Sequence, residues 1–163
     1  MEQETLMKSK WEGNVSTKIE DVNADQIWPL IKDFFGIYKY FPNLQVSYGV
    51  QGNNGEVGSI RYCEQVVSPT VVHWAKEKIT AVDPDQRSLT FEIIDGNSGL
   101  RSCVATVKVV DPSGEHDDQS LGCVLSWTFS FDALEGVKFE DLVKKYQMWI
   151  EICAQNMKDS LVK

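Results

Sequence analysis

One arginine and one glutamate fall in neighbouring segments whose composition predicts β-strands. Arg61 lies in residues 57–66 and Glu77 in residues 70–82, with a short turn between the two segments. A guanidinium beside a carboxylate favours the ionised carboxylate and offers it a planar fork of donors. Such a pair can take a proton from a small molecule while the guanidinium stabilises the anion that forms. These two residues are therefore the first candidates for a catalytic site.

Strand alternation predicts where the two side chains point. Because successive side chains of a strand face opposite sides of the sheet, Glu77 shares a face with Ile79 and Ala81, whereas lysines occupy the other face. Lysines are rarely buried, so the face of Glu77 is expected to be interior. Both faces around Arg61 mix polar and apolar groups, and its direction is less determined. A structural ion pair and two surface charges remain alternatives.

Further candidates lie near these segments. His73 falls on the face of Glu77 by parity and could aid proton transfer, with a hydrogen-bonded core or rim histidine as the alternative. The tryptophans are expected to pack in or near the core. Four aromatic residues could line the mouth of a pocket, with ordinary packing as the alternative: Tyr38, Tyr40, Phe41 and Tyr62.

Charge and composition exclude several classes of protein. The chain has 163 residues and a formal net charge of -8, which disfavours nucleic acid and anionic membranes as partners. No apolar run approaches the roughly 20 residues of a membrane span, and the N-terminus has no signal-like segment, so a cytoplasmic protein is expected. The 4 cysteines and 2 histidines are isolated in sequence. We therefore expect no metal and no cofactor, and thiols that pack as small core hydrophobes.

The first third of the chain predicts a strand followed by two short helices. Apolar and polar residues alternate through residues 11–18, as in a half-buried strand. Asn23 and Gln26 have the spacing of a capping box, which predicts the start of a helix that Gly36 then ends. A second short helical turn is expected over residues 37–41.

The middle of the chain predicts an antiparallel meander. Segments rich in β-branched and aromatic residues alternate with turn signals at hairpin spacing, without crossover helices. Residues 115–120 are acidic and polar, and are expected to form the longest and most mobile hairpin loop. The predicted strands are residues 44–51, 57–66, 70–82, 87–95, 100–110 and 121–132.

The last segment predicts one long amphipathic helix. Its apolar residues recur at helical spacing, so the helix is expected to cover the sheet, and the same stripe could roof a cavity through Tyr146 and Ile150. The expected fold is α+β, with a seven-stranded antiparallel sheet curved around this helix. A single domain is expected over residues 10–163, with residues 1–9 as a flexible tail. The stripe consists of Phe139, Leu142, Val143, Tyr146, Ile150, Cys153, Met157 and Leu161.

This order of elements resembles the helix-grip fold of START-type lipid carriers, the birch-pollen-allergen family and plant abscisic-acid receptors, within the polyketide cyclase/dehydrase and lipid transport superfamily. Local matches across residues 9–160 are most similar to plant lachrymatory-factor synthase and its relatives. The resemblance implies an internal cavity for a small hydrophobic ligand and no cofactor. The matching runs are Lys10–Gly13, Ile27–Phe34, Val57–Tyr62 and Trp74–Lys78.

The synthase resemblance assigns roles to particular residues. An arginine and a glutamate are the reacting pair of that family, and by motif they correspond to Arg61 and Glu77. Two cavity tyrosines of the synthase align with Phe91 and Cys103, so two hydroxyl donors are missing here. This difference puts the synthase's own reaction in doubt, because its substrate must be held by hydrogen bonds. Two functions follow: a ligand-binding protein, or a cofactor-independent isomerase or cyclase.

The receptor resemblance breaks down at the motifs that sense the hormone. The buried lysine that holds the hormone carboxylate aligns with Asn43, and residues 67–71 replace the gate loop. No clear latch motif is present in residues 96–101. Hormone sensing with a phosphatase partner is therefore not expected, and the identity of any protein partner stays open.

Overall fold

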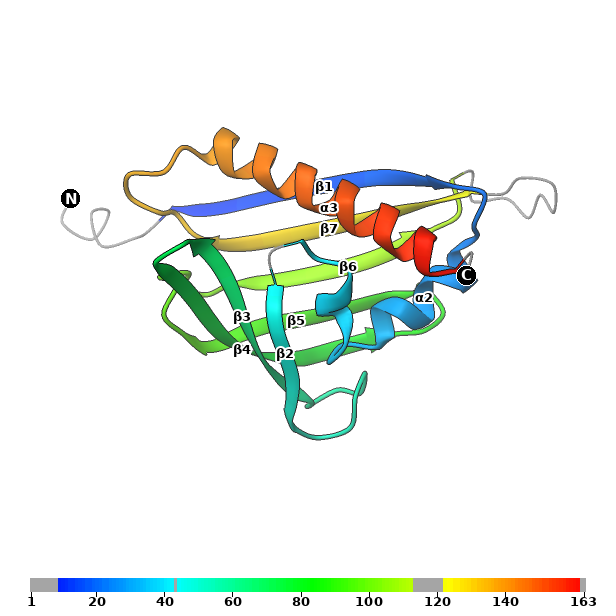
Figure 1. Cartoon of the computed structure of the whole chain (residues 1–163), viewed down its shortest axis with the longest axis horizontal. Coiled ribbons are helices and arrows are strands. Elements are labelled where there is room, and N and C mark those ends of the chain that lie inside the picture. Colours follow the sequence, from blue (N-terminus) through cyan, green and yellow to red (C-terminus); the bar gives the residue numbers. More distant parts are fainter. Residues whose placement is uncertain (1–8, 43, 113–121, 162–163) are drawn as a thin grey trace.

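The computed structural model describes residues 9–42, 44–112 and 122–161, in which seven strands and a long C-terminal helix form two layers (Figure 1). In chain order the elements are β1 (Lys10–Glu20), α2 (Ala24–Lys32), the 3₁₀ helix η1 (Ile37–Lys39), β2 (Leu44–Gln51), β3 (Ile60–Ser68), β4 (Val71–Asp83), β5 (Ser88–Gly96), β6 (Val104–Val110), β7 (Gly122–Asp132) and α3 (Phe139–Leu161).

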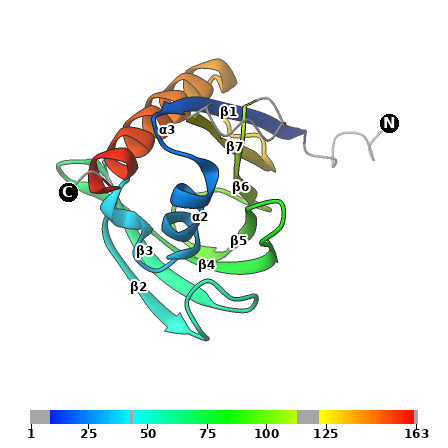
Figure 2. The ribbon, with the colours of Figure 1, turned by 90° about the vertical axis from the view of Figure 1, so that its right-hand side faces the viewer.

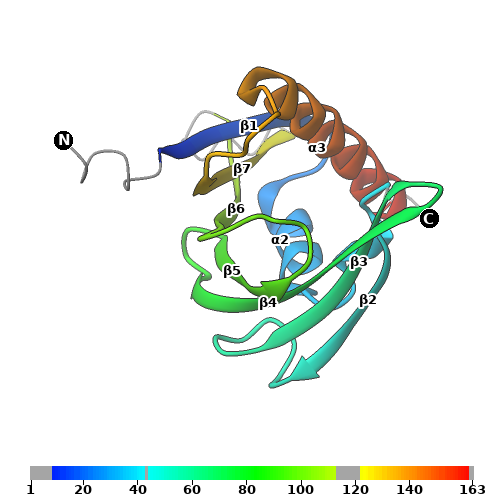
Figure 3. The same cartoon turned by 90° about the vertical axis from the view of Figure 1, so that its left-hand side faces the viewer.

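The seven strands form one antiparallel sheet in the order β1-β7-β6-β5-β4-β3-β2. Strands β2 to β7 pair with their neighbours in the chain, and β1 pairs with β7 along its whole length. The two end views show the sheet bent into a curve whose open side α3 crosses, and α2 appears inside that curve (Figures 2 and 3). The predicted α+β helix-grip fold is confirmed.

The buried core lies between the concave face of the sheet, α2 and α3. Helix α3 supplies five buried residues: Tyr146, Ile150, Cys153, Ala154 and Met157. All four cysteines are free and buried, which confirms their prediction as core residues. No helix in the described ranges is both long and apolar enough to cross a membrane.

Helix α2 begins as predicted and ends early. The side chain of Asn23 accepts a hydrogen bond from the Gln26 backbone at 3.0 Å, and the Gln26 side chain accepts one from the Asn23 backbone at 2.9 Å, which completes the capping box. The helix ends at Lys32, before the predicted stop at Gly36, because the Asp33 carboxylate accepts from the Gly36 N–H at 3.2 Å and closes a turn. The backbone beyond Lys32 is therefore available to the interior.

Two strands begin later than predicted. Strand β3 starts at Ile60 rather than residue 57, because residues 53–59 form turns in which Gly58 adopts a φ of 92°. Strand β6 starts at Val104 rather than residue 100, because Ser102 adopts a φ of 55° that breaks the extended backbone. The expected tail at residues 1–9 and loop at residues 115–120 fall almost wholly outside the described residues.

A β-bulge makes the inward face of β4 differ from the predicted one after Ile79. Glu77 and Ile79 are buried as expected, but Ala81 is exposed and Val82 packs against the core instead. The register between β4 and β5 shifts between Ile79 and Ala81, so the inward and outward positions exchange there. The site lies on the side of the bulge where simple alternation holds.

Candidate functional site

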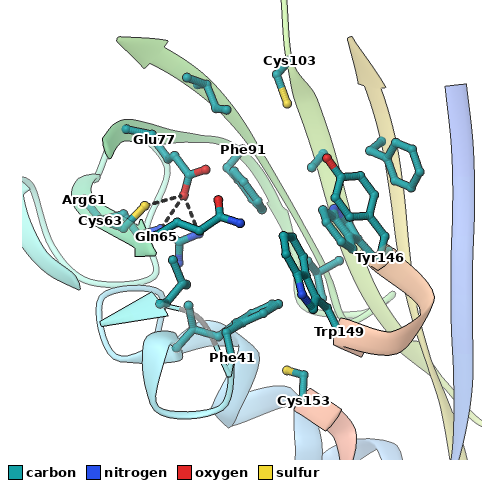
Figure 4. A pocket seen from close by; sticks show the side chains of 18 of the residues that line it. Phe41, Arg61, Cys63, Gln65, Glu77, Phe91, Cys103, Tyr146, Trp149 and Cys153 are labelled. Atoms are coloured by element: carbon teal, nitrogen blue, oxygen red, sulfur yellow. Dashed lines mark hydrogen bonds and ion pairs between the residues drawn. The ribbon is translucent and has the colours of Figure 1, made fainter. Parts of the chain in front are cut away.

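A hollow of about 170 Å³ lies between the sheet and α3 (Figure 4). Aromatic and aliphatic side chains make up most of its wall, and its polar side chains include Arg61 and Gln65 of β3, His73 and Glu77 of β4, Ser98 after β5, and Tyr146 of α3. Eight of the candidate residues line it: Phe41, Arg61, His73, Glu77, Phe91, Cys103, Tyr146 and Ile150. The fold therefore brings these candidates together around one space.

Arg61 and Glu77 form a buried ion pair in the wall of this cavity. They face each other in the register of β3 and β4, and their exposed fractions are only 5% and 8%. The Nε of Arg61 donates to Oε1 of Glu77 at 2.8 Å, and Nη2 approaches the same oxygen at 2.6 Å. Both contacts therefore converge on one carboxylate oxygen, and neither charged group points into bulk solvent.

The guanidinium is held on its other sides by Phe34 and Phe91. Its Nη1 donates at 2.8 Å to the carbonyl of Phe34, which lies two residues beyond the end of α2. The Phe34 ring lies 3.9 Å and the Phe91 ring 5.2 Å from Cζ, so both rings add cation–π attraction. Arg61 is thus fixed by a carboxylate, a carbonyl and two aromatic faces.

The second carboxylate oxygen of Glu77 is left open. Cys63 Sγ donates to Oε1 at 3.6 Å, so all hydrogen bonds that Glu77 receives from the described residues converge on Oε1. In Figure 4, the other oxygen points away from Arg61 toward the hollow. This arrangement presents a hydrogen-bond acceptor, or a proton acceptor, to whatever occupies the cavity.

The cavity thiols are poor nucleophiles. Burial, followed by the charge of Glu77, raises the pKa of Cys63 to about 12. Burial and the same carboxylate raise the pKa of Cys103 to about 12. Because the thiolate is the reactive form, both side chains remain protonated at neutral pH. In the described ranges, no three histidine, cysteine or carboxylate side chains gather as a metal site would require.

Of the four aromatic residues expected at a pocket mouth, Phe41 lines the cavity. Tyr62 lies on the outer face of the sheet, stacked between Tyr48 at 5.2 Å and Trp74 at 6.0 Å, so ordinary packing holds for it. Of the described lining residues, none is Tyr38 or Tyr40. The half-buried His73 lines the cavity. Asn43, the position aligned with the hormone-binding lysine, lies outside the described residues.

Several lining residues were not predicted as site residues. Gln65 and Cys63 share the face of Arg61 by alternation, so the inward direction of Arg61 would have revealed them. Trp127 and Trp149 were expected to be packing residues, yet both line the cavity. Phe34 was assigned to the apolar face of a helix, and its contact with the guanidinium depends on where α2 ends.

Removing one partner of the ion pair should destabilise the protein more than replacing both partners with apolar residues. Arg61→Leu or Glu77→Gln should each lower the free energy of unfolding by about 3–5 kcal/mol, because each leaves a buried charge without its partner. The double variant Arg61→Met/Glu77→Leu should recover most of that loss, because apolar side chains replace both charges. Urea denaturation measures all three.

The exposed pair of Lys10 and Asp132, 3.2 Å apart, provides the control. Lys10→Met should cost less than about 1 kcal/mol. Single variants of Arg61 or Glu77 with costs that small would contradict a buried pair.

The raised thiol pKa values predict slow labelling of the native protein. At pH 8, a disulfide reagent should modify Cys63 and Cys103 about a thousandfold more slowly in the folded chain than in urea, because the thiolate is the attacking form. The native rate should rise about tenfold per pH unit up to pH 11, whereas the unfolded chain levels off above pH 9. Native labelling at the unfolded rate would contradict this.

Comparisons with known proteins agree with the architecture. A family model described as polyketide cyclase / dehydrase and lipid transport matches residues 10–161. MLP-like protein 31 from Arabidopsis thaliana is 28% identical over 111 residues, which cover 67% of this chain and 58% of that protein. The abscisic acid receptor PYL2 from the same plant is 28% identical over 118 residues, which cover 72% of this chain and 60% of the receptor. The chain thus spans less than two thirds of the length of these relatives.

A solved structure shows the same fold. The crystal structure of major latex-like protein 151 from Panax ginseng superposes with a TM-score of 0.72 at 20% identity, over 93% of this chain and 97% of that one. At this identity the likeness concerns the fold alone. The family model matches the chain from the start of β1 to the end of α3, and this match shows the family as well as the fold. The chain belongs to the polyketide cyclase / dehydrase and lipid transport family.

Proposed function

We propose that the protein binds a small, mostly apolar molecule in its internal cavity, without a cofactor. The observation that carries this proposal is a hollow of about 170 Å³ with a mostly apolar wall, into which the buried Arg61–Glu77 pair is set. An apolar protein cavity of about 150 Å³ takes up benzene, so a compact ligand of roughly one ring is expected here. Drug-sized ligands need pockets of about 300–1,000 Å³.

Membership of a family described by polyketide cyclases and lipid transport supports this proposal. One relative is named as a receptor for a small molecule, abscisic acid. Neither relationship identifies the ligand of this chain. The size and polarity of the cavity restrict the ligand more closely than its relatives do.

Ligand binding should raise the thermal stability of the protein. Toluene or indole at 100 times its dissociation constant should add about 2.7 kcal/mol to the free energy of unfolding. For a chain of this size, that corresponds to an increase in Tm of roughly 5–10 °C. Differential scanning fluorimetry across a panel of apolar compounds measures the shift.

A cavity-filling variant and a surface control make the binding test specific. Ala105 lines the cavity and is 3% exposed, so Ala105→Leu should fill the space and remove the shift. Ala81 is exposed, so Ala81→Leu should leave the shift unchanged. No shift in the wild type with any compound, or an equal shift in Ala105→Leu, would contradict binding in this cavity.

The open oxygen of Glu77 favours a second candidate function, a cofactor-independent isomerase of the lachrymatory-factor synthase type. Glu77 would take a proton from the substrate and return it at another atom, while the charge of Arg61 stabilises the intermediate anion. In the synthase reaction, the hydroxyl proton of 1-propenylsulfenic acid moves to carbon and yields propanethial S-oxide. Phe91 and Cys103 line the cavity where the synthase has tyrosines, so fewer hydroxyl groups would hold that substrate.

Variants of the pair distinguish an enzyme from a binding protein. Glu77→Gln and Arg61→Leu should lower turnover of 1-propenylsulfenic acid, generated in situ, by at least about a hundredfold if the pair moves the proton. The thermal shift with toluene serves as the control, because it reports an intact cavity. Turnover equal to that of the wild type would exclude the pair from the chemistry, and wild-type turnover no faster than the uncatalysed reaction would exclude this enzyme.

A further inference from the structure

Two polar groups of the cavity, Glu77 and Tyr146, lie on opposite walls. The open oxygen of Glu77 projects from β4, and the hydroxyl of Tyr146 projects from α3 on the other side of the hollow (Figure 4). Mostly apolar side chains separate these two groups. A ligand that spans the cavity therefore meets a different hydrogen-bonding group at each end.

Tyr146 is a rigidly placed hydrogen-bond donor. Its ring packs against Trp127 at 4.5 Å, Phe129 at 5.0 Å and Trp149 at 5.4 Å, which fixes the direction of its hydroxyl. Among the hydrogen bonds between described residues, none uses this hydroxyl. Burial, with a smaller effect from Cys103, raises the pKa of Tyr146 well above that of a free phenol, so the group keeps its proton. The hydroxyl can therefore donate a hydrogen bond to an acceptor on a ligand without any rearrangement of the protein.

The wall opposite Tyr146 offers the open oxygen of Glu77 as an acceptor, beside the Gln65 amide, which can both donate and accept. The described charged residues of the lining are Arg61 and Glu77, whose charges offset each other. An anionic ligand would bring an uncompensated charge into an apolar space and close to the carboxylate, which is strongly unfavourable. A neutral ligand with a hydroxyl group or another polar hydrogen instead satisfies the open oxygen of Glu77.

We propose that the cavity selects neutral, compact carbonyl compounds that also carry a hydroxyl group, with the carbonyl bound by Tyr146 and the hydroxyl by Glu77. This inference rests on the proposed ligand-binding function and adds the chemical class of the ligand. Tyr146 thereby supplies, from α3, a hydroxyl donor in a cavity where Phe91 and Cys103 provide none. Specificity follows because each matched polar group recovers a hydrogen bond that an apolar ligand leaves unmade.

Isothermal titration with disubstituted benzenes of similar size tests the proposal at pH 6. The probes are p-xylene with neither group, p-cresol with a donor, p-tolualdehyde with an acceptor, and 3- and 4-hydroxybenzaldehyde with both at two separations. Each hydrogen bond should strengthen binding about fivefold, so the better hydroxybenzaldehyde should bind about 25-fold more tightly than p-xylene. The anion p-toluate should bind more weakly than p-tolualdehyde.

Tyr146→Phe isolates the donor on α3. It should weaken binding of p-tolualdehyde and the hydroxybenzaldehydes about fivefold, and leave the affinities for p-xylene and p-cresol unchanged. Tyr62→Phe is the matched control, because Tyr62 donates to Glu64 on the outer face of the sheet at 2.8 Å, and it should change no affinity.

The outcomes separate this inference from the function on which it rests. If p-xylene binds and all the neutral probes bind equally well, the chemical class is wrong and ligand binding stands. If p-toluate binds more tightly than p-tolualdehyde, selection for neutral ligands is overturned. If no probe binds the wild type, the proposed ligand-binding function itself fails.

Discussion

The burial of one guanidinium–carboxylate pair constrains the rest of this structure. Removing each ion from water costs several kcal/mol, so the pair is tolerated only where further polar contacts surround it. The register of β3 and β4 sets Arg61 opposite Glu77, and the segment after α2 brings the Phe34 carbonyl to the guanidinium. The curved sheet and α3 then enclose the same space. Strand register, helix length and sheet curvature all converge on this contact.

The two carboxylate oxygens of Glu77 differ in their hydrogen bonds, and this difference gives the cavity its chemistry. Oε1 of Glu77 takes the hydrogen bonds from Arg61 and Cys63, while the other oxygen faces the hollow. Because this oxygen receives no hydrogen bond from the described residues, a ligand that donates to it gains affinity. The opposed Tyr146 hydroxyl adds a donor that needs no reorganisation. The apolar wall provides the contact area for a ligand, and these two polar groups determine how the ligand is oriented.

Much of the fold was predictable because it depends on local patterns. The capping box of α2, the apolar stripe of α3 and the inward direction of Glu77 all follow from short periodicities. The position of Ala81 was not predictable, because a bulge exchanges the two faces of β4 without any signal in an alternating sequence. Tyr62 packs between rings on neighbouring strands, and the inward turn of Arg61 depends on a carbonyl from a distant helix end. Such contacts arise only from the tertiary arrangement.

A crystal structure of the protein soaked with 4-bromophenol tests the role of the open carboxylate oxygen most directly, because the anomalous signal of bromine locates the probe. We expect the bromine inside the cavity and the phenol oxygen within about 3.2 Å of the carboxylate oxygen of Glu77 that Arg61 does not contact. A probe bound only outside the cavity, or one whose hydroxyl turns away from Glu77, would contradict the assignment of this pair as the polar anchor of a ligand site.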